Sequence, residues 1–264
     1  MEIDTNKLRI SLVQAAISWE NKTRNTEHYG HLLEKLSGKS DLAVLPEMFS
    51  TGFSMRAGHL AETNEDATIV AIRSWAKNFG FAVCGSFLAK DESGRIFNRG
   101  FFITPQGDSY FYDKRHLFRM GEENKQFTAG DRILIIPYKT WKIRLIICYD
   151  LRFPVWNRNT DNAYDLLICP ANWPIARANV WQVLLQARAL ENQSYVCGVN
   201  RIGEDGLKIP HQGDSVLLDF KGNTVIETVR NSESVVTGTI QKDFLETFRK
   251  KFPAWMDADR FEIK

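Results

Sequence analysis

The chain is poor in several features that mark specialised classes of protein. It has only 4 cysteines in 264 residues, and no two of them form a CxxC pair. This spacing argues against a disulfide framework and favours free thiols in a reducing compartment. It has no apolar run of about 18 residues, the length that a membrane-spanning helix needs, and its first residues lack the basic and apolar regions of a secretory signal. We therefore expect a cytoplasmic protein that does not enter the membrane.

The chain also lacks a strong charge of either sign. Its 34 lysines and arginines face 32 aspartates and glutamates, which gives a net charge of +2, so we expect no general affinity for nucleic acid or anionic membranes. The dense basic run at residues 248–252 suits the C-terminal end of a helix, where the dipole favours cations. No linker, low-complexity tract or repeat interrupts the chain, and 44% of its residues are hydrophobic. We expect residues 1–264 to form a single domain.

Common catalytic and nucleotide-binding motifs are missing as well. There is no GxSxG, because Ser54 follows Gly52 but Arg56 stands where the second glycine belongs. His28 and His31 are spaced by about one helical turn without an HExxH, which favours an exposed helix face over a zinc site. Neither GxxxxGK nor GxGxxG occurs. Serine hydrolases, zinc hydrolases and nucleotide-binding enzymes therefore lack support.

The periodicity of apolar residues predicts an α/β chain that is rich in strands. Helical spacing occurs in four segments, and glycines suited to helix ends follow the first two at Gly38 and Gly80. Tight connections at 105–107 and 221–223 join neighbouring strand candidates, which requires antiparallel pairs. We therefore expect a mixed sheet covered by helices. The expected helices are residues 25–36, 66–79, 178–192 and 242–251, and the expected strands are residues 10–17, 42–45, 81–87, 100–104, 109–112, 143–147, 166–169, 195–199, 215–220, 225–229 and 235–240.

Among the four cysteines, Cys148 differs from the others in its surroundings. It ends an apolar strand candidate just before a polar turn, whereas Cys84 and Cys197 lie in apolar runs typical of core strands. Cys169 precedes Pro170, which has no backbone N–H to donate to a developing oxyanion. Reacting groups in open α/β sheets collect at the carboxyl ends of strands. Cys148 is therefore the candidate nucleophile, and its ordinary alternative is an inert core thiol.

Two other polar side chains follow apolar strand candidates. Glu47 has apolar neighbours that would raise its pKa and suit it to proton transfer near neutrality. Lys114 could stabilise an oxyanion. The ordinary alternatives are a solvated loop acid for Glu47, and a solvated strand exit or part of a phosphate-binding cluster for Lys114. One sheet could bring both side chains to the same edge as Cys148, although spacing alone leaves open a papain-like pair of Cys148 with His116 or His211.

Three segments resemble, in this order, the signature blocks of the nitrilase superfamily of carbon–nitrogen hydrolases. They are LPEMFSTGF at 45–53, YDKRHLF at 112–118 and ICYDLRFP at 147–154. PANWP at 170–174 and QARALEN at 186–192 are similar to the family's later strand and helix. The resemblance is closest to the omega-amidase branch, which hydrolyses the side-chain amide of 2-oxo acids such as 2-oxoglutaramate. It implies a four-layer α-β-β-α sandwich with mixed sheets, no metal or cofactor, and assembly into homodimers or larger homo-oligomers.

Carried over residue by residue, the resemblance implies catalytic roles for four side chains. It makes Cys148 the nucleophile, Glu47 the general base and acid, and Lys114 the cation that stabilises the oxyanion. Glu123 matches the family's second acid, which helps to orient the lysine or the proton shuttle, with Glu122 as the alternative one position away. The implied reaction is hydrolysis of a non-peptide amide through a cysteinyl thioester, with release of ammonia.

Other groups are expected to contact the substrate. The backbone N–H of Tyr149 would donate to the oxyanion. Substrates of this branch carry a carboxylate remote from the amide, and Arg152 and Arg177 are the candidates to bind it, since arginine can bind a carboxylate through two hydrogen bonds. Either arginine could instead form a surface or interface ion pair. Phe53 and Trp173 are candidate apolar walls of the pocket, or plain core aromatics.

Two alternatives to an omega-amidase stay open at this point. The first is a sister hydrolase that acts on a nitrile or an N-carbamoyl compound with the same three residues. The second is a non-catalytic binding protein on the same fold. For the enzymes, the expected partner is a small-molecule substrate rather than nucleic acid or a membrane.

Overall fold

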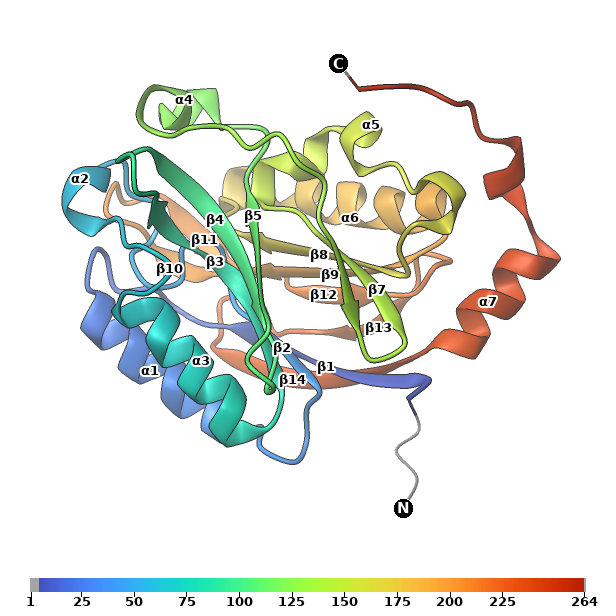
Figure 1. Cartoon of the computed structure of the whole chain (residues 1–264), viewed down its shortest axis with the longest axis horizontal. Coiled ribbons are helices and arrows are strands. Elements are labelled where there is room, and N and C mark those ends of the chain that lie inside the picture. Colours follow the sequence, from blue (N-terminus) through green and yellow to red (C-terminus); the bar gives the residue numbers. More distant parts are fainter. Residues whose placement is uncertain (1–4, 264) are drawn as a thin grey trace.

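Two six-stranded sheets, stacked face to face, form the centre of the molecule (Figure 1). In this computed structural model, which describes residues 5–263, the strand orders are β14-β1-β2-β3-β4-β5 and β13-β12-β9-β8-β7-β6. The first sheet consists of β1 (Lys7–Gln14), β2 (Leu42–Val44), β3 (Ala82–Lys90), β4 (Ile96–Ile103), β5 (Ser109–Asp113) and β14 (Ser234–Gln241). The second consists of β6 (Ile135–Tyr138), β7 (Trp141–Leu145), β8 (Leu166–Ala171), β9 (Tyr195–Asn200), β12 (Val216–Leu218) and β13 (Thr224–Glu227). A separate hairpin pairs β10 (Ile202–Glu204) with β11 (Pro210–Gln212).

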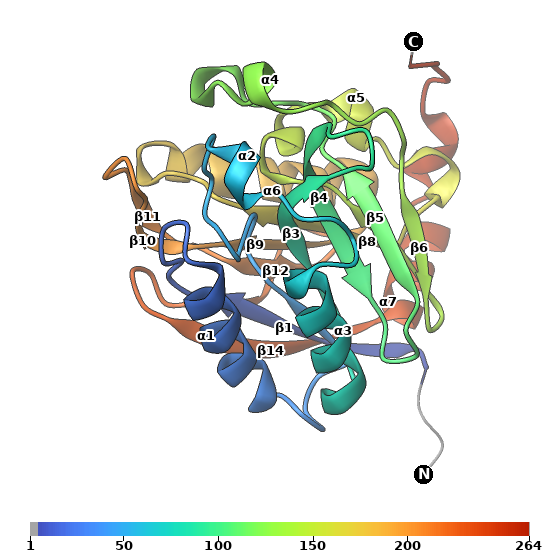
Figure 2. The same ribbon diagram turned by 60° about the vertical axis from the view of Figure 1, so that its left-hand side comes forward.

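Helices cover the outer faces of both sheets. On the first sheet, α1 (Lys22–Glu34) and α3 (Ala67–Phe79) lie side by side (Figure 2), and α6 (Ala178–Asn192) packs on β9 and β12 of the second. α7 (Lys242–Lys251) follows β14. The short helices are α2 (Ala57–Leu60), α4 (Glu123–Gln126) and α5 (Pro154–Asn157), and the 3-10 turns are η1 (Arg119–Gly121), η2 (Cys148–Arg152), η3 (Thr160–Asn162), η4 (Ile175–Arg177) and η5 (Ala254–Asp257). The layers form the expected α/β sandwich. None of the helices within residues 5–263 is long and apolar enough to cross a membrane.

Apolar side chains fill the spaces between the layers. The inner core joins the two sheets through buried residues such as Phe102 and Ile143, and an outer core beneath α1 and α3 contains Ile72. At Gly100 on β4 the sheets approach so closely that an added Cβ would lie 2.9 Å from Leu145 Cδ2 on β7, inside the usual contact distance. This close packing fixes one sheet relative to the other and therefore fixes the loops at their shared edge.

Most of the expected elements are confirmed. Every apolar run named above overlaps a strand, and the two tight connections join the antiparallel pairs β4–β5 and β12–β13. The helices expected at 66–79, 178–192 and 242–251 are α3, α6 and α7. Gly80 ends α3 in the left-handed conformation, with φ 76°, which glycine adopts without the steric cost of a side chain.

The expected bounds of the first helix are wrong. It begins at Lys22 rather than residue 25, because the Asn21 side chain caps it by accepting a hydrogen bond from the Arg24 N–H at 3.0 Å. It ends at Glu34, and Gly38 lies in the turns beyond it.

Three strands were also not expected from the sequence. β6 contains Pro137, which is tolerated because this strand lies at an edge of its sheet. β10 and β11 have three residues each, too few for periodicity to mark them.

The strands that precede Glu47, Lys114 and Cys148 do end near one another, but they belong to two sheets. β2 and β5 lie in the first sheet, and β7 lies in the second. The expectation of a single sheet edge is therefore wrong. Because the sheets are stacked, the loop after β7 faces the loops after β2 and β5 across the end of the sandwich, and a cavity forms between them.

Candidate active site

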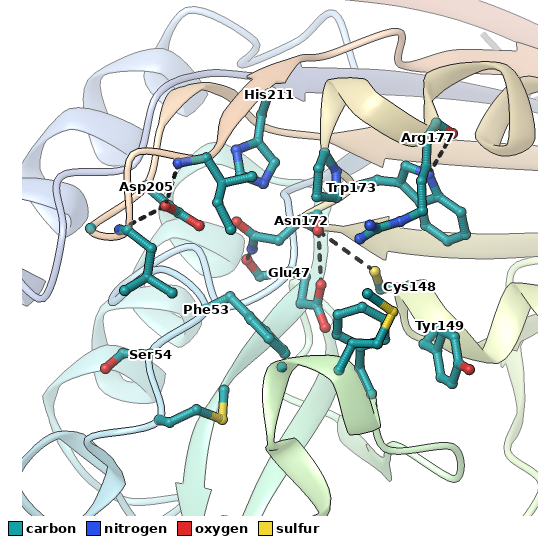
Figure 3. Close-up of a pocket in the computed structure, with 18 of the residues that line it drawn as sticks. Glu47, Phe53, Ser54, Cys148, Tyr149, Asn172, Trp173, Arg177, Asp205 and His211 are labelled. Carbon is teal, nitrogen blue, oxygen red and sulfur yellow. Dashed lines mark hydrogen bonds between the residues drawn. The ribbon is translucent and has the colours of Figure 1, made fainter.

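A cavity of about 470 Å³ lies at the end of the sandwich, among the loops that follow β2, β5, β7 and β8. The β10–β11 hairpin closes one of its sides. Figure 3 shows side chains from the loops after β2, β7 and β8 and from the hairpin directed toward the same space. The residues expected from the sequence that line it are Glu47, Phe53, Lys114, Cys148, Tyr149, Arg152, Trp173 and Arg177.

Glu47 is fully buried, and hydrogen-bond donors surround its carboxylate. Its Oε1 accepts from Asn98 Nδ2 at 2.7 Å and from Lys114 Nζ at 2.8 Å. Its Oε2 accepts from the backbone N–H of Asn172 at 2.8 Å, and the Asn172 side-chain amide donates to the Glu47 backbone carbonyl. These donors fix the position of the carboxylate, and Oε2 keeps capacity to accept a further hydrogen bond.

Lys114 lies between two buried carboxylates. Its Nζ is 2.8 Å from Glu47 Oε1 and 3.0 Å from Glu123 Oε2, and it lies 5.3 Å from the centre of the Phe53 ring. Burial opposes the charge, but the negative charges of Glu123 and Glu47 outweigh it and raise the pKa of Lys114 well above its usual range. Lys114 therefore stays cationic, as a group that stabilises an oxyanion must.

Glu123, and not Glu122, is the acid beside this lysine. Glu123 is fully buried at the start of α4, where its Oε2 accepts from the Phe118 N–H at 2.6 Å and its Oε1 from Asn98 Nδ2 at 3.0 Å. Burial raises the pKa of Glu123, and the charge of the lysine offsets part of that rise. Glu122 is exposed and pairs with Lys125. The two adjacent acids therefore point to opposite sides of the loop.

Cys148 begins the 3-10 turn η2 with a left-handed backbone, φ 43°. This conformation is uncommon for a residue with a side chain, and here the thiol lines the cavity (Figure 3). Its Sγ lies 4.0 Å from the Asn172 carbonyl oxygen. Burial and the negative charge of Glu47 raise the pKa of Cys148 well above its usual range, and Lys114 counteracts only part of this rise. The resting group is therefore a thiol, which needs a base to become a nucleophile.

Asp150 holds the turn that carries Cys148, a role that the sequence motifs did not reveal. Its buried carboxylate accepts from the Ile147 N–H at 3.1 Å and the Tyr112 hydroxyl at 2.8 Å. It also contacts the backbone N–H of His116 at 2.9 Å and the ring Nδ1 at 2.8 Å. Asp150 thereby links the loop after β7 to the loop that follows β5.

Two asparagines in the site were also missed. Asn98 lies on β4, fully buried, and its amide donates to both Glu47 and Glu123. The strand expected at 100–104 starts too late to include it. Asn172 follows β8 and contacts both Glu47 and Cys148. A buried polar side chain needs a partner, so an asparagine within or next to an apolar run was the signal that could have found both.

The other expected residues lie around the reaction centre. The Tyr149 N–H has no hydrogen-bond partner in the part of the chain that the structure describes, so it can donate to a substrate. The Arg152 guanidinium lies 5.2 Å from the Trp173 ring centre, and that of Arg177 lies 5.3 Å from the Phe118 ring centre. Neither arginine pairs with a carboxylate among residues 5–263, and both line the cavity.

The geometry does not support a papain-like cysteine–histidine pair. The His116 ring contacts Asp150 and stacks on Phe153 with ring centres 3.7 Å apart. His211 lines the cavity from β11. Among the described residues, no hydrogen bond joins either histidine to the Cys148 sulfur. The charged side chains that shift the pKa of the thiol most are instead Glu47 and Lys114.

Comparison with known proteins yields one consistent family. The model for the carbon-nitrogen hydrolase family matches residues 9–250. The chain is 40% identical to the omega-amidase YafV of Escherichia coli strain K12, over 97% of this chain and 98% of that one. It is 29% identical to a 2-oxoglutaramate amidase of Bacillus subtilis, over 95% of this chain and 97% of that one. A solved CN-hydrolase superfamily protein from Xanthomonas campestris, with an arsenic adduct in its active site, is 44% identical to this chain. The match covers 98% of this chain and 99% of that one, with a TM-score of 0.95.

Proposed function

The chain belongs to the carbon–nitrogen hydrolase family, and we propose that it is an omega-amidase that acts on a 2-oxo acid such as 2-oxoglutaramate. Its omega-amidase relatives make it an enzyme that hydrolyses amide carbon–nitrogen bonds. One observation carries the catalytic part of the proposal. Glu47, Lys114 and Cys148 come together in a single cavity, and Lys114 is held there between two buried carboxylates.

In the proposed first step, the Cys148 sulfur bonds to the amide carbon while Glu47 takes the thiol proton. The raised pKa of Cys148 supports this order, because the thiol stays protonated until a base acts on it. Glu47 suits the role, since it lines the cavity together with Cys148, and one backbone N–H among the described residues donates to its Oε2. The carbonyl electron pair moves onto oxygen, where Lys114 and the Tyr149 N–H stabilise the negative charge.

The proposed second half of the reaction uses the same carboxylate. The tetrahedral intermediate collapses, the carbon–nitrogen bond breaks, and ammonia leaves with the proton that Glu47 took from the thiol. The acyl group stays on Cys148 as a thioester. Glu47 then takes a proton from a water molecule that attacks the thioester carbon, and it returns that proton to the sulfur as the acid leaves. Each half-reaction thus begins and ends with an ionised Glu47.

The cavity also suits the rest of such a substrate. Arg152 and Arg177 line it without a carboxylate partner among the described residues, so one of them can bind the substrate carboxylate. Phe53 and Trp173 also line it and would contact the methylene groups. In this proposal, the positive charge fixes the carboxylate and thereby directs the amide carbon toward Cys148.

We further propose that the protein acts as a homodimer or larger homo-oligomer in the cytoplasm. Val155 on α5 and Val183 on α6 are 57% and 54% exposed, and exposed apolar side chains on neighbouring elements support self-association. The four cysteines are free and buried, which suits a reducing compartment.

The decisive experiment measures ammonia release from 2-oxoglutaramate, glutamine, N-carbamoyl-β-alanine and a simple nitrile, with Cys148→Ala as the blank. We expect turnover of 2-oxoglutaramate to exceed that of the other three compounds. Release of carbon dioxide together with ammonia from the carbamoyl compound, at a higher rate, would replace the proposal with the N-carbamoyl hydrolase. No turnover of any compound, and no acyl adduct at Cys148 by mass spectrometry, would favour a non-catalytic protein.

A further inference from the structure

Two polar side chains on the cavity wall lack hydrogen-bond partners. Asn172 Oδ1 and His211 Nδ1 are both buried, and neither has a partner among the residues that the structure describes. Both residues line the cavity that contains Cys148, and they are only 8% and 4% exposed. A buried polar atom without a partner is unfavourable. A ligand group that completes both hydrogen bonds would therefore be bound selectively.

The contacts of Asn172 determine where its Oδ1 can act. Its backbone N–H donates to Glu47 Oε2, and its side-chain Nδ2 donates to the Glu47 carbonyl oxygen. These two hydrogen bonds hold the amide in one orientation. In Figure 3 the Asn172 side chain extends away from Cys148, on the side of the cavity where His211 lies. Oδ1 is therefore placed to contact a part of the substrate beyond its amide carbon.

His211 is an uncharged group in this wall. Burial and, next, the positive charge of Arg201 lower the pKa of His211 to about 4. Near neutral pH the ring is therefore neutral, with one N–H donor and one acceptor nitrogen. Arg201 is buried and donates to the carbonyl oxygens of Ile17, Ile202 and Glu204, with no carboxylate partner in the described part of the chain. The positive charge of Arg201 acts on the ring more strongly than the negative charge of Asp205, which also lines the cavity, so an oxygen atom is favoured as the ligand of His211.

We propose that Asn172 and His211 form a specificity subsite for an oxygen substituent on the substrate carbon next to the carboxylate. The inference rests on the proposed omega-amidase function. In a five-carbon ω-amide, this carbon lies three carbon–carbon bonds from the amide carbon, so its substituent contacts the cavity wall and not the reaction centre. The His211 N–H donates to that oxygen. Asn172 Oδ1 accepts from a hydroxyl there, either a 2-hydroxy group or a hydrated 2-oxo group, whereas an unhydrated 2-oxo group uses His211 alone.

The test compares three ω-amides of equal length: 2-oxoglutaramate, 2-hydroxyglutaramate and glutaramate, which lacks the substituent. The wild type should favour each substituted amide over glutaramate by about tenfold or more in kcat/KM, as expected for hydrogen bonds to buried groups that are otherwise unpaired. In His211→Phe, which keeps a ring but cannot form the hydrogen bond, the ratio for 2-oxoglutaramate should fall about tenfold. His211→Gln, which keeps a donor, should retain part of the preference. Because each ratio is measured within one variant, a loss common to all three substrates cancels.

Lys208→Ala is the matched control, since Lys208 lies in the same hairpin, is 84% exposed and is not among the residues that line the cavity. It should keep the wild-type ratios. Equal kcat/KM for the three amides in the wild type, or an unchanged ratio in His211→Phe, would overturn the subsite while leaving the proposed function intact. If His211→Phe does not fold, the wild-type ratios and His211→Gln decide the question. No ammonia from any of the three amides would overturn the proposed function itself.

Discussion

Replacing Lys114 with alanine removes the cation that two buried carboxylates share. Lys114 Nζ is 2.8 Å from Glu47 and 3.0 Å from Glu123, and all three side chains are at most 1% exposed. In the proposed mechanism this ammonium stabilises the oxyanion, and loss of one such donor typically costs ~2.7–4 kcal/mol in the transition state. We therefore expect kcat for 2-oxoglutaramate to fall by a factor of about 100 or more, with a smaller change in KM.

The same substitution should also change how stability depends on pH. Without the ammonium, Glu47 and Glu123 repel each other in a buried site, so one of them keeps a proton to a higher pH than in the unfolded chain. A group whose pKa is raised on folding stabilises the fold at low pH, and this contribution is lost as the pH rises through the folded-state value. Lys114→Ala should therefore be destabilised by about 3–5 kcal/mol near neutral pH, and by less near about pH 5.

The assay is steady-state ammonia release, combined with urea unfolding at several pH values. Lys125→Ala is the control, because Lys125 lies on α4 close to Glu123 but is exposed, and its one ion pair among residues 5–263 is with Glu122. It should keep the wild-type kcat and stability. A near-wild-type kcat in Lys114→Ala would refute the role of Lys114 at the oxyanion, and a loss of stability that is equal at all pH values would refute the account of the two carboxylates.

Three other substitutions test separate parts of the site. Glu123→Gln removes the buried charge that helps to hold Lys114 and should lower kcat by about tenfold or more, whereas the exposed Glu122→Gln should not; equal rates in the two variants would contradict this assignment. Asp150→Asn puts an amide donor in place of a carboxylate oxygen that accepts hydrogen bonds from the loops of Cys148 and Lys114. The urea midpoint should therefore fall by the equivalent of about 1–3 kcal/mol, and an unchanged midpoint would count against this role of Asp150. Of the two variants Arg152→Ala and Arg177→Ala, one should show a KM for 2-oxoglutaramate about tenfold above that of the wild type. Two unchanged KM values would mean that neither arginine binds the substrate carboxylate.

The fold could be predicted where the sequence pattern is strong and local. Apolar runs mark buried strands because a strand that is covered on both faces needs apolar side chains throughout, and β8 and β9 are examples. The short strands β10 and β11 carry no such pattern. Nor could local patterns show that the strands before Glu47 and Cys148 lie in different sheets. Stacking of sheets depends on contacts between residues far apart in the chain, such as Gly100 and Leu145.

The candidate site could be predicted in its charged centre but not in its supporting groups. Glu47, Lys114 and Cys148 each follow an apolar run, which makes them visible as polar side chains at strand ends. Asn98 and Asp150 act through hydrogen bonds to partners that are distant in sequence, so their roles appear only when the chain is folded. The choice between Glu122 and Glu123 likewise depended on which side of the loop each faces.

Mass spectrometry of Cys148 during turnover tests the central claim most directly. The wild type, mixed with 2-oxoglutaramate and quenched in acid at short times, should carry the acyl group of the substrate on the peptide that contains Cys148, and one ammonia should be released for each acyl group formed. Cys148→Ala should show neither the adduct nor ammonia. Steady release of ammonia from a wild-type enzyme whose Cys148 peptide remains unmodified at every time, or ammonia release by Cys148→Ala, would contradict the account.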